Sequence, residues 1–530
     1  MSITVQNLTY MHPDKEILFQ DISFSIENGL KAGLVGNNGS GKSTLLQIIS
    51  KKDVLPSNGE IICHETPYYI PQHFGQYNDL NVAQALHINE KLTALHAILE
   101  GDASEINFAT LNDDWNIEER SNVALASWGL DYIDLFQKFE NLSGGEKTRV
   151  FLAGIDIHNP QIILMDEPTN HLDYNSRNTL YETINSSRST MLIVSHDRTL
   201  LNQMPSIYEL TQNEIVYYAG NYDFYKAEKE QYLNSLQEKL EDKEKELRLA
   251  RKIARETAER KEKHESRGKK NNIKKGVGKM AMDTLQDKAE KSRAKLNDVH
   301  TDKLNSISQD LSKLRSSLSD QKSMKIDFNT SDLHTGKILV TAQDVDYSYD
   351  SRYLWNEPLS FQIKSGERVL IKGKNGSGKT TLIKLITEAL QPSKGTVDKA
   401  EYKYVFLDQE YTMINNNLTV LEQVQLFNSG LLDHEIRTIL NRFLFTYDTW
   451  DKSCSKLSGG EKMKLALCCL MVGANTPDMF ILDEPTNNID VQNIEILTAT
   501  IRDYKGTVLL VSHDEYFINQ VGIDYTIELS

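Results

Sequence analysis

Two stretches of the chain, GNNGSGKST at residues 36–44 and GKNGSGKTT at residues 373–381, repeat one pattern of glycines, lysine and hydroxyl residues. The pattern G-x-x-x-x-G-K-[ST] describes a phosphate-binding loop, in which glycines let backbone N–H groups surround a phosphate. An apolar run precedes each stretch and another follows it, as expected for a loop between a strand and a helix. The sequence therefore predicts two nucleotide-binding α/β domains.

Three further motifs recur in the same order after each loop. LSGGEK begins at residues 142 and 457, DEPTN at 166 and 483, and VSHD at 194 and 511. Four ordered matches indicate a duplicated domain. In each copy, apolar strand-like runs alternate with amphipathic stretches, which predicts an α/β fold with a largely parallel sheet.

The first copy is longer than the second. Gln72 and Gln409 are 337 positions apart, whereas the LSGG motifs are 315 apart, so the first copy has 22 extra residues between these points. They fall within residues 87–120, where the pattern predicts a helix, a turn and a second helix. A surface insertion without a function is the alternative.

A segment of different composition separates the two copies. Residues 222–324 contain no proline and are dominated by Glu, Lys, Arg, Gln and Leu. Apolar residues at spacings of three, four and seven, within 233–247 and 304–318, indicate seams of the coiled-coil type. Three glycines between the seams, at 268, 276 and 278, disfavour one long helix. We expect a helical hairpin with residues 266–279 near its tip, and domains at 1–222, 223–325 (the linker) and 326–530.

The linker has a charge opposite to that of the whole protein. The chain of 530 residues has a formal net charge of −16, yet residues 260–279 contain nine Lys or Arg and two Glu. A concentrated basic segment on an acidic protein suits contact with RNA phosphates. Simple solvation of a charged helix is the alternative.

The sequence predicts neither a membrane span nor a secretion signal. The longest uncharged apolar run, LALCCLMVGA at 465–474, is ten residues long, and a span needs about 20. The first residues, MSITVQNLTY, lack a basic region followed by an apolar one. The four cysteines have no metal-site or disulfide-framework spacing. We expect a cytoplasmic protein.

The two loops supply the predicted phosphate-binding residues. In each, the lysine brings a positive charge to the β- and γ-phosphates, and the hydroxyl residue after it can bind Mg²⁺. These residues are Gly36, Asn37, Asn38, Gly39, Ser40, Gly41, Lys42, Ser43 and Thr44, and in the second copy Gly373, Lys374, Asn375, Gly376, Ser377, Gly378, Lys379, Thr380 and Thr381.

Acids and histidines at strand ends supply the remaining chemistry. IILMDEP and MFILDEP each end an apolar strand with an aspartate, which can hold the metal, and a glutamate, which can polarise the attacking water as a general base. The histidine after the next strand can contact the γ-phosphate and orient that water, although a single histidine is more often structural. The residues are Asp166 and Asp483, Glu167 and Glu484, and His196 and His513.

The LSGGE motifs predict a second anion site in each copy. A serine and two glycines before a helix offer a hydroxyl, N–H groups and a helix N-terminus. Such a site is redundant within one domain and useful if it closes over the nucleotide of the other. The residues are Ser143, Gly144 and Gly145, and Ser458, Gly459 and Gly460.

The ordered set of phosphate-binding loop, glutamine (Gln72, Gln409), LSGGE, DEP and SHD resembles the ATP-binding cassette superfamily and covers both halves of the chain. Two such cassettes, a charged helical linker and GNYDFY at 220–225 resemble the ABC-F subfamily. The resemblance implies an ATPase with the P-loop NTPase fold that binds the ribosome near the tRNA exit site and influences translation.

The resemblance also implies a head-to-tail sandwich with ATP at two composite sites. Lys42 and Glu167 would face the second LSGGE motif, and Lys379 and Glu484 the first. The cofactors implied are ATP and Mg²⁺. The metal ligands implied are Ser43, Gln72, Asp166, Thr380, Gln409 and Asp483.

An aromatic residue ahead of the loop is implied to stack on adenine. Tyr349 has this position in the second copy, and the first copy offers His12 with Tyr10 two residues earlier. An aromatic residue near a strand end often serves only packing.

The resemblance implies that the linker reaches toward the P-site tRNA and the peptidyl-transferase region, without a membrane or DNA partner. The contacts to RNA would come from Arg267, Lys269, Lys270, Lys274 and Lys275.

Three functions stay open. The short insertion, the long linker and an end just after the second SHD motif favour a ribosomal protection factor against antibiotics. A housekeeping ABC-F translation factor is the alternative within the subfamily. An ATPase subunit of a membrane transporter is the alternative of another class, and such a subunit does not need the basic linker.

Overall fold

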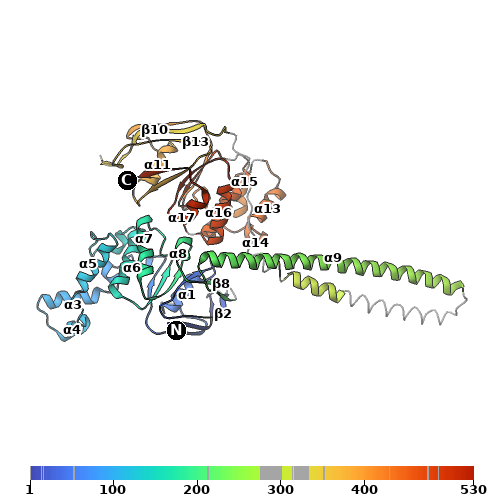
Figure 1. Cartoon of the computed structure of the whole chain (residues 1–530), viewed down its shortest axis with the longest axis horizontal. Helices are drawn as coiled ribbons and strands as arrows, with labels where there is room; N and C mark the ends of the chain where they lie inside the picture. Colours follow the sequence, from blue (N-terminus) through green and yellow to red (C-terminus); the bar gives the residue numbers. More distant parts are fainter. Residues whose placement is uncertain are drawn as a thin grey trace. The chain divides into compact units, whose positions relative to one another are not determined.

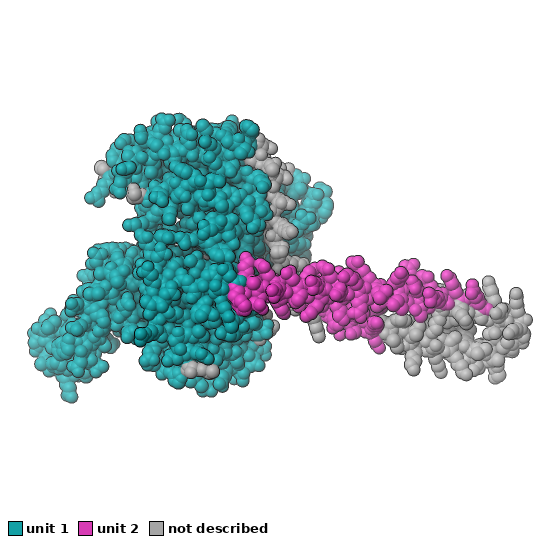
Figure 2. Space-filling view, viewed as in Figure 1, with its two compact units in different colours: residues 1–223, 324–530 teal, residues 224–323 magenta. Residues whose placement is uncertain are grey.

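The computed structural model describes residues 2–13, 15, 17–51, 54–211, 214–274, 301–312, 314–315, 333–349, 352–428, 430–473, 477–487 and 489–529. Figure 1 shows the helices and strands along the chain. The chain divides into two compact units, residues 1–223 with 324–530, and residues 224–323 (Figure 2). The first unit contains both copies of the repeat, and the second is the helical segment between them.

A central sheet of six strands organises the first copy. The strand order is β5-β6-β7-β3-β8-β9, and neighbours pair in parallel except β8 with β9. Every residue of β6 and β7 is buried, which explains why these strands read as continuous apolar runs rather than alternating ones. The strands are β3 (Lys31–Val35), β5 (Tyr68–Ile70), β6 (Ile162–Asp166), β7 (Thr190–Val194), β8 (Ser206–Leu210) and β9 (Ile215–Tyr218).

The second copy repeats this sheet with five strands, all parallel, in the order β16-β17-β18-β14-β19. The predicted α/β fold with a largely parallel sheet is therefore confirmed in both copies. The strands are β14 (Arg368–Gly373), β16 (Tyr404–Leu407), β17 (Met479–Asp483), β18 (Thr507–Val511) and β19 (Tyr525–Leu529).

Each copy also has an antiparallel sheet of three strands, in the orders β2-β1-β4 and β13-β10-β15. A two-stranded hairpin, β11 with β12, accompanies the second. The strands are β1 (Ile3–Met11), β2 (Ile17–Ile26), β4 (Asn58–Cys63), β10 (Ile338–Asp346), β11 (Ser348–Tyr349), β12 (Arg352–Tyr353), β13 (Leu359–Lys364) and β15 (Lys394–Lys399).

Each copy has helices between its strands, and the first copy has the additional helices of its insertion. Those of the first are α1 (Lys42–Ile49), α2 (Val82–Ala85), α3 (Asn89–Leu99), α4 (Glu105–Leu111), α5 (Ile117–Ser127), α6 (Gly144–His158), α7 (Tyr174–Ser186) and α8 (Arg198–Asn202), with 3₁₀ turns at Gly75–Tyr77 and Phe139–Asn141. Those of the second are α11 (Lys379–Ile386), α12 (Val420–Leu426), α13 (Asp433–Arg442), α14 (Tyr447–Trp450), α15 (Gly459–Val472), α16 (Val491–Asp503) and α17 (Glu515–Val521), with a 3₁₀ turn at Cys454–Lys456.

The insertion of the first copy contains α3 and α4, which pack together between α2 and α5. A largely buried carboxylate fixes its base. Asp114 accepts hydrogen bonds from both terminal nitrogens of Arg120, at 2.9 and 3.0 Å, and lies 2.8 Å from Lys91 Nζ. A bidentate arginine pair of this kind gives geometric specificity as well as energy.

Strand register brings the motif-bearing loops to one edge of each sheet. In the first copy Val194, at the end of β7, pairs with Asp166 of β6 on one side and Leu34 of β3 on the other. In the second copy Val511 likewise pairs with Asp483 and Ile371. Because the carboxyl ends of parallel strands lie level, the loops that follow them meet at a common edge, where α/β sheets bind ligands.

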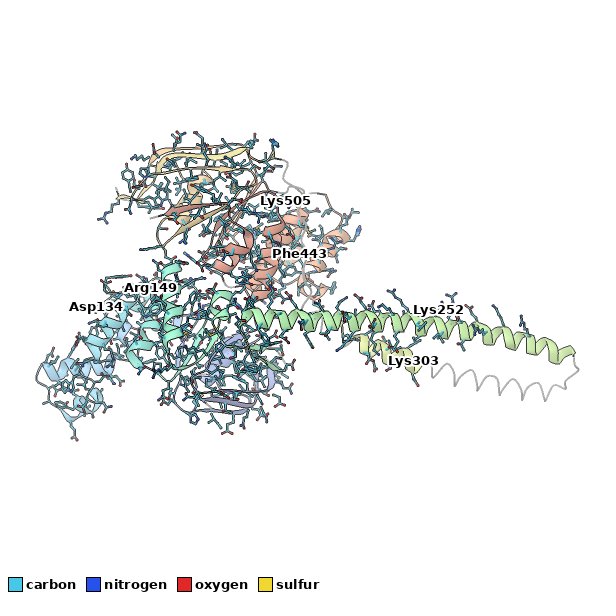
Figure 3. The ribbon with its side chains drawn as sticks, in the orientation of Figure 1. Asp134, Arg149, Lys252, Lys303, Phe443 and Lys505 are labelled. Carbon is cyan, nitrogen blue, oxygen red and sulfur yellow. The ribbon has the colours of Figure 1, made fainter. Side chains whose placement is uncertain are left out.

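The second compact unit is built mainly from α9 (Tyr222–Lys274), a helix of 53 residues. Residues 301–312 are also helical and run back beside it (Figure 1). Ion pairs join the two segments, from Lys243 to Asp310 at 3.4 Å and from Arg315 to Glu244 at 2.6 Å. Figure 3 labels one exposed lysine on each segment, at positions 252 and 303.

Gly268 does not end α9, which continues through it to Lys274, a residue inside the range 266–279 expected near the tip. One glycine costs a helix only about 1 kcal/mol, and here good helix formers surround it. Gly276 and Gly278, with the rest of the expected tip beyond residue 274, lie outside the described residues.

None of the helices in the described parts of the chain is both long and apolar enough to cross a membrane.

We expect Gly154→Ala to destabilise the first copy. A Cβ at this position of α6 would meet the hydroxyl oxygen of Tyr68, which donates to the carbonyl of Phe151 at 2.9 Å. Overpacking of this kind costs about 1–3 kcal/mol, measurable as a lower thermal unfolding midpoint. Gly75→Ala is the matched control, since nothing lies within 4 Å of its Cβ position. Adding Tyr68→Phe should recover part of the loss, and unchanged stability of Gly154→Ala would contradict this packing.

Candidate functional site

The loop between β3 and α1 holds Lys42 by its own carbonyl groups. Lys42 Nζ donates to the carbonyls of Gly36 at 2.8 Å and Asn37 at 3.0 Å. Gly41 has a φ of 94°, and a Cβ there would lie 2.7 Å from the Leu18 side chain. Only glycine adopts this left-handed conformation in so little space, so the loop keeps the ammonium group inside its curve.

The loop between β14 and α11 has the same construction. Lys379 Nζ donates to the carbonyls of Gly373 at 2.9 Å and Lys374 at 3.1 Å. It also lies 3.3 Å from His513 Nε2. Burial lowers the pKa of both loop lysines, and the neighbouring acidic residues oppose that shift.

The two glutamates that follow β6 and β17 have left-handed backbones, with φ of 51° at Glu167 and 50° at Glu484. Non-glycine residues seldom adopt this conformation, and strain of this kind gathers at functional sites. The backbone N–H of Glu167 donates to the carbonyl of Val194, and that of Glu484 to Val511, each at 2.8 Å. These bonds hold each carboxyl group at the carboxyl edge of its own sheet.

A histidine faces each of these carboxyl groups. His196 Nε2 lies 3.3 Å from Glu167 Oε1, and His513 Nε2 lies 3.4 Å from Glu484 Oε1. The backbone N–H of each histidine also donates to Oε2 of its glutamate, at 3.1 and 3.4 Å. Both pairs are almost fully buried. The backbone N–H and the side chain of each histidine therefore both contact its glutamate.

Burial controls the protonation of these pairs. It raises the pKa of Glu167 to about 8, with a smaller contribution from the Asp166 carboxylate, and raises the pKa of Glu484 to about 7. Burial lowers the pKa of His513 to about 3 and lowers the pKa of His196 well below its ordinary value. The histidines are therefore neutral beside carboxyl groups that exchange a proton near neutral pH.

A cavity of about 390 Å³ is lined by residues of both copies. Lys42, Glu167 and His196 line it from the first copy, and Ser458 and Gly459 line it from the second. The first loop and the second LSGGE motif therefore share one cavity. A hydrogen bond supports this contact, since the backbone N–H of Asn38 donates to Asp490 Oδ2 at 3.3 Å.

Two adjoining cavities form the corresponding region at the second loop. One, of about 700 Å³, is lined by the loop with Gln409 and Glu484. The other, of about 240 Å³, is lined by the first LSGGE motif with Gln409, Glu484 and His513. The side chain of Asn375 crosses between the copies and donates to the carbonyl of His171 at 2.9 Å.

Most residues singled out from the sequence line these cavities. The first cavity takes Asn38, Gly39, Gly41, Lys42, Ser43, Thr44, Gln72, Asp166, Glu167, His196, Ser458 and Gly459. The other two take Ser143, Gly144, Gly145, Tyr349, Asn375, Gly376, Gly378, Lys379, Thr380, Thr381, Gln409, Asp483, Glu484 and His513. Gly36, Asn37, Ser40, Gly373, Lys374, Ser377 and Gly460 are not among the lining residues.

The aromatic candidates differ in whether they line a cavity. His12 lines the first cavity, whereas Tyr10 packs edge-on against His12 with ring centroids 5.3 Å apart. Tyr349 lines the second region and is 53% exposed. Its hydroxyl lies 3.2 Å from Thr381 Oγ1.

Sequence reasoning missed some residues of the site. Asp490 recurs as Asp173 seven positions after each motif aspartate, so comparison of the repeats contained a signal for it. Arg177, which lines the 240 Å³ cavity, has Ile494 at the matching position of the second copy. A search for repeated motifs could not find it.

Comparison with known proteins identifies the family of the chain. The family model described as "ABC transporter" matches residues 19–170 and again residues 356–487. The chain belongs to the ATP-binding cassette family. Each match includes one phosphate-binding loop, one LSGGE motif and one DEP motif, so the chain has two cassettes, and ATP hydrolysis is its reaction.

Full-length relatives place the chain in the F subfamily. ABC transporter F family member 5 of Arabidopsis thaliana is 28% identical over 548 residues, which cover 98% of this chain and 74% of that protein. The energy-dependent translational throttle protein EttA of Escherichia coli K12 is 29% identical over 563 residues, covering 98% of this chain and 92% of EttA. Because these matches include both cassettes and the linker, the transporter-subunit alternative is wrong.

A solved structure shares the fold of the whole chain. It is the complex of the archaeal ribosomal stalk protein aP1 with the archaeal ribosome recycling factor aABCE1. The TM-score is 0.59 at 18% identity, over 98% of this chain and 87% of that chain. Both cassettes therefore have the P-loop NTPase fold.

Replacing either loop lysine should empty one ATP site. Lys42→Ala and Lys379→Ala each remove a cation expected to hydrogen bond phosphate, an interaction worth about 1.5–3 kcal/mol or roughly 10- to 150-fold in affinity. Titration with a fluorescent ATP analogue should then detect one tight site instead of two. Lys384→Ala, on the exposed face of α11, is the control. Equal losses from all three changes would contradict the assignment.

Proposed function

We propose that this ABC-F ATPase works on the ribosome, where it binds near the tRNA exit site and directs its linker toward the P-site tRNA and the peptidyl-transferase region. The observation that carries the proposal is the similarity to the translational throttle protein EttA, which covers 98% of this chain and so includes the linker. The basic segment of that linker supports it, because RNA phosphates attract concentrated positive charge.

The cassettes supply the energy for this action. Lys42 and Lys379 bind the β- and γ-phosphates of ATP, and the N-termini of α15 and α6 close over those phosphates from the opposite cassette. Glu167 and Glu484 accept a proton from the attacking water, since a carboxyl group with a pKa near 7 to 8 suits a general base. The neutral histidines orient that water.

Oxygen ligands suited to Mg²⁺ lie beside each loop lysine. Asp166 Oδ1 is buried and has no hydrogen-bond partner among the described residues, and Ser43 and Gln72 line the same cavity. In the second cassette Thr380 Oγ1 donates to Asp483 Oδ2 at 3.2 Å, with Gln409 on the same cavity. Carboxylate, hydroxyl and amide oxygens match the preference of Mg²⁺. When bound, the ion would neutralise charge on the β- and γ-phosphates.

The proposed RNA contacts lie toward the end of α9. Arg267 is exposed on this helix, and Lys269, Lys270 and Lys274 are further residues of it. Lys275 lies outside the described residues. Residues 260–279 contain nine basic and two acidic residues in a chain of net charge −16, so contact with a polyanion is favoured here over the rest of the protein.

Within this proposal the protein acts in ribosomal protection, supported by the long linker and an insertion of only 22 residues in the first cassette. A housekeeping translation factor is the alternative. An antibiotic that binds the peptidyl-transferase centre separates the two in a purified translation system. Protection predicts that adding the protein with ATP restores peptide synthesis. Unchanged inhibition across several such antibiotics would favour the housekeeping role.

Loss of hydrolysis should trap the protein on ribosomes. The double variant Glu167→Gln/Glu484→Gln keeps ATP binding but lacks both general bases, so we expect it to co-sediment with ribosomes in ATP. Changing the proposed contact residues to Ala in that background should reduce retention at least about tenfold, because each lost phosphate contact removes favourable charge interaction. The contact changes are Lys269→Ala, Lys270→Ala, Lys274→Ala and Lys275→Ala.

A matched control removes the same charge from exposed positions earlier on α9. Its changes are Lys239→Ala, Lys245→Ala, Arg248→Ala and Lys252→Ala. Retention equal to the double variant would assign binding to the end of α9. If the double variant binds ATP but does not sediment with ribosomes, the ribosomal proposal fails.

A further inference from the structure

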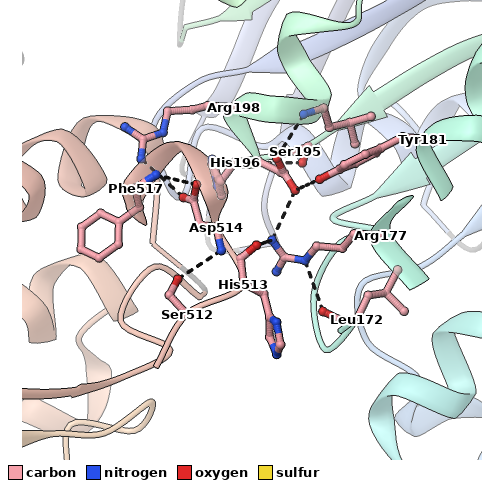
Figure 4. Close-up of polar contacts among 12 residues, drawn as sticks. Leu172, Arg177, Tyr181, Ser195, His196, Arg198, Ser512, His513, Asp514 and Phe517 are labelled. Atoms are coloured by element: carbon pink, nitrogen blue, oxygen red, sulfur yellow. Dashed lines mark hydrogen bonds and ion pairs between the residues drawn. The ribbon is translucent and has the colours of Figure 1, made fainter. Parts of the chain in front are cut away.

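Arg177 of α7 reaches from the first cassette to the second ATP site (Figure 4). Its Nη1 donates to the main-chain carbonyl of His513 at 3.2 Å. The same nitrogen lies 3.4 Å from Asp197 Oδ2, and Nε donates to the carbonyl of Leu172 at 3.2 Å. The side chain is 9% exposed. The arginine is thus held at three points, one of them beside the histidine of the opposite cassette.

The carboxylate that pairs with this arginine is itself fixed. Asp197 Oδ2 accepts the hydroxyl of Tyr181 at 2.6 Å, and Oδ1 caps α8 by accepting the N–H of Leu200 at 3.1 Å. A buried charge is costly without its partner, so Arg177 is expected to remain in this arrangement. Since Asp197 directly follows His196, the arginine links the histidine loop of one cassette to that of the other.

The position of Arg177 gives the second site a cation from outside its own cassette. Arg177 lines the 240 Å³ cavity together with Ser143, Gly144, Glu484 and His513. A guanidinium group at this wall fixes the backbone of His513, whose N–H and side chain both face Glu484. The pair that acts on the water at the second site is therefore positioned partly by the first cassette.

The first site has no equivalent. The repeats align without gaps from Asp166 to Asp197 and from Asp483 to Asp514, which places Ile494 opposite Arg177. Ile494 is 1% exposed and belongs to the hydrophobic core of the second cassette. No arginine is among the residues found to line the first cavity in the described part of the chain. The two sites therefore differ in charge and in support for the histidine.

On the proposed roles of Glu484 and His513, we infer that Arg177 is a positioning residue for ATP hydrolysis chiefly at the second site, because it bonds the backbone of His513 itself. By holding the carbonyl of His513, it keeps the imidazole against Glu484 and the water-activating pair in its working geometry. In the described part of the chain no arginine bonds the carbonyl of His196, and Arg177 meets that loop only through Asp197. The two sites share the motif lysine, glutamate and histidine. They differ in the arginine that the opposite cassette supplies to the backbone of the histidine.

The test isolates each site before changing the arginine. Glu167→Gln leaves the second site active, Glu484→Gln leaves the first, and the double variant gives the residual rate. Lys42→Ala and Lys379→Ala provide a second way to isolate the sites. Arg177→Met, which keeps the aliphatic length, is introduced into each single-site protein, and kcat and KM for ATP are measured with the full chain.

We expect Arg177→Met to lower kcat at the second site about tenfold or more, with KM changed less than about threefold, because misplacing a catalytic group affects the reaction more than binding. At the first site kcat should fall clearly less than at the second, because Arg177 meets that histidine loop only through Asp197. Arg177→Lys should restore part of the rate, since an ammonium group can also donate to the carbonyl of His513. Arg188→Met, an exposed change in the same cassette, should leave both sites unaffected.

Two results would overturn the inference. Equal losses at both sites would make Arg177 a general support of the cassette contact, and no loss at either site would remove its role altogether. If Arg177→Met does not fold, as judged by its thermal unfolding, Arg177→Gln and Arg177→Lys provide the same comparison between sites.

Discussion

A buried carboxyl group at the end of a buried strand is the constraint on which each cassette depends. Glu167 and Glu484 are only 6% and 7% exposed, and an unpaired carboxylate in such surroundings is costly. The protein meets that cost by raising the pKa of both groups and by keeping the facing histidines neutral. The nearby lysines donate to loop carbonyls instead. The lysine and the glutamate of each site therefore make no direct hydrogen bond among the described residues, which suits the proposed binding of a phosphate between them.

The parallel sheets place this carboxyl group beside the other residues of the site. Their register sets the phosphate-binding loop, the acids and the histidine level at one edge, so three segments distant in sequence meet without long loops. At each edge, residues of the other cassette's LSGGE motif line part of the cavity. The proposed hydrolysis would therefore depend on the contact between cassettes as well as on the residues within either one.

Within the cassettes the sequence predicted most of the repeated site residues and missed Arg177, which occurs in one copy only. The loops, the acids and the parallel sheet follow from local patterns that occur twice, and one copy verifies the other. Arg177 has no repeated signal, because its role arises only when two cassettes meet. The three glycines placed the hairpin tip only within 266–279, and Gly268 itself stays helical because a cost of about 1 kcal/mol is small beside the long run of helix formers in α9. His12 and Tyr10 could not be separated, because both lie near the end of one strand and only packing shows which of them lines the cavity.

Fusion of two cassettes in one chain is what permits the two sites to differ. In a symmetric dimer each contact occurs twice, so a residue placed at one site is also placed at the other. Here Arg177 and Arg198 both come from the first cassette, and their counterparts, Ile494 and Glu515, do not return the contacts. Arg198 is fully buried, lies 3.4 Å from Asp514 Oδ2 and stacks on Tyr516 with its guanidinium carbon 4.4 Å from the ring centre. Two buried arginines from one side therefore make the contact between the two histidine loops asymmetric.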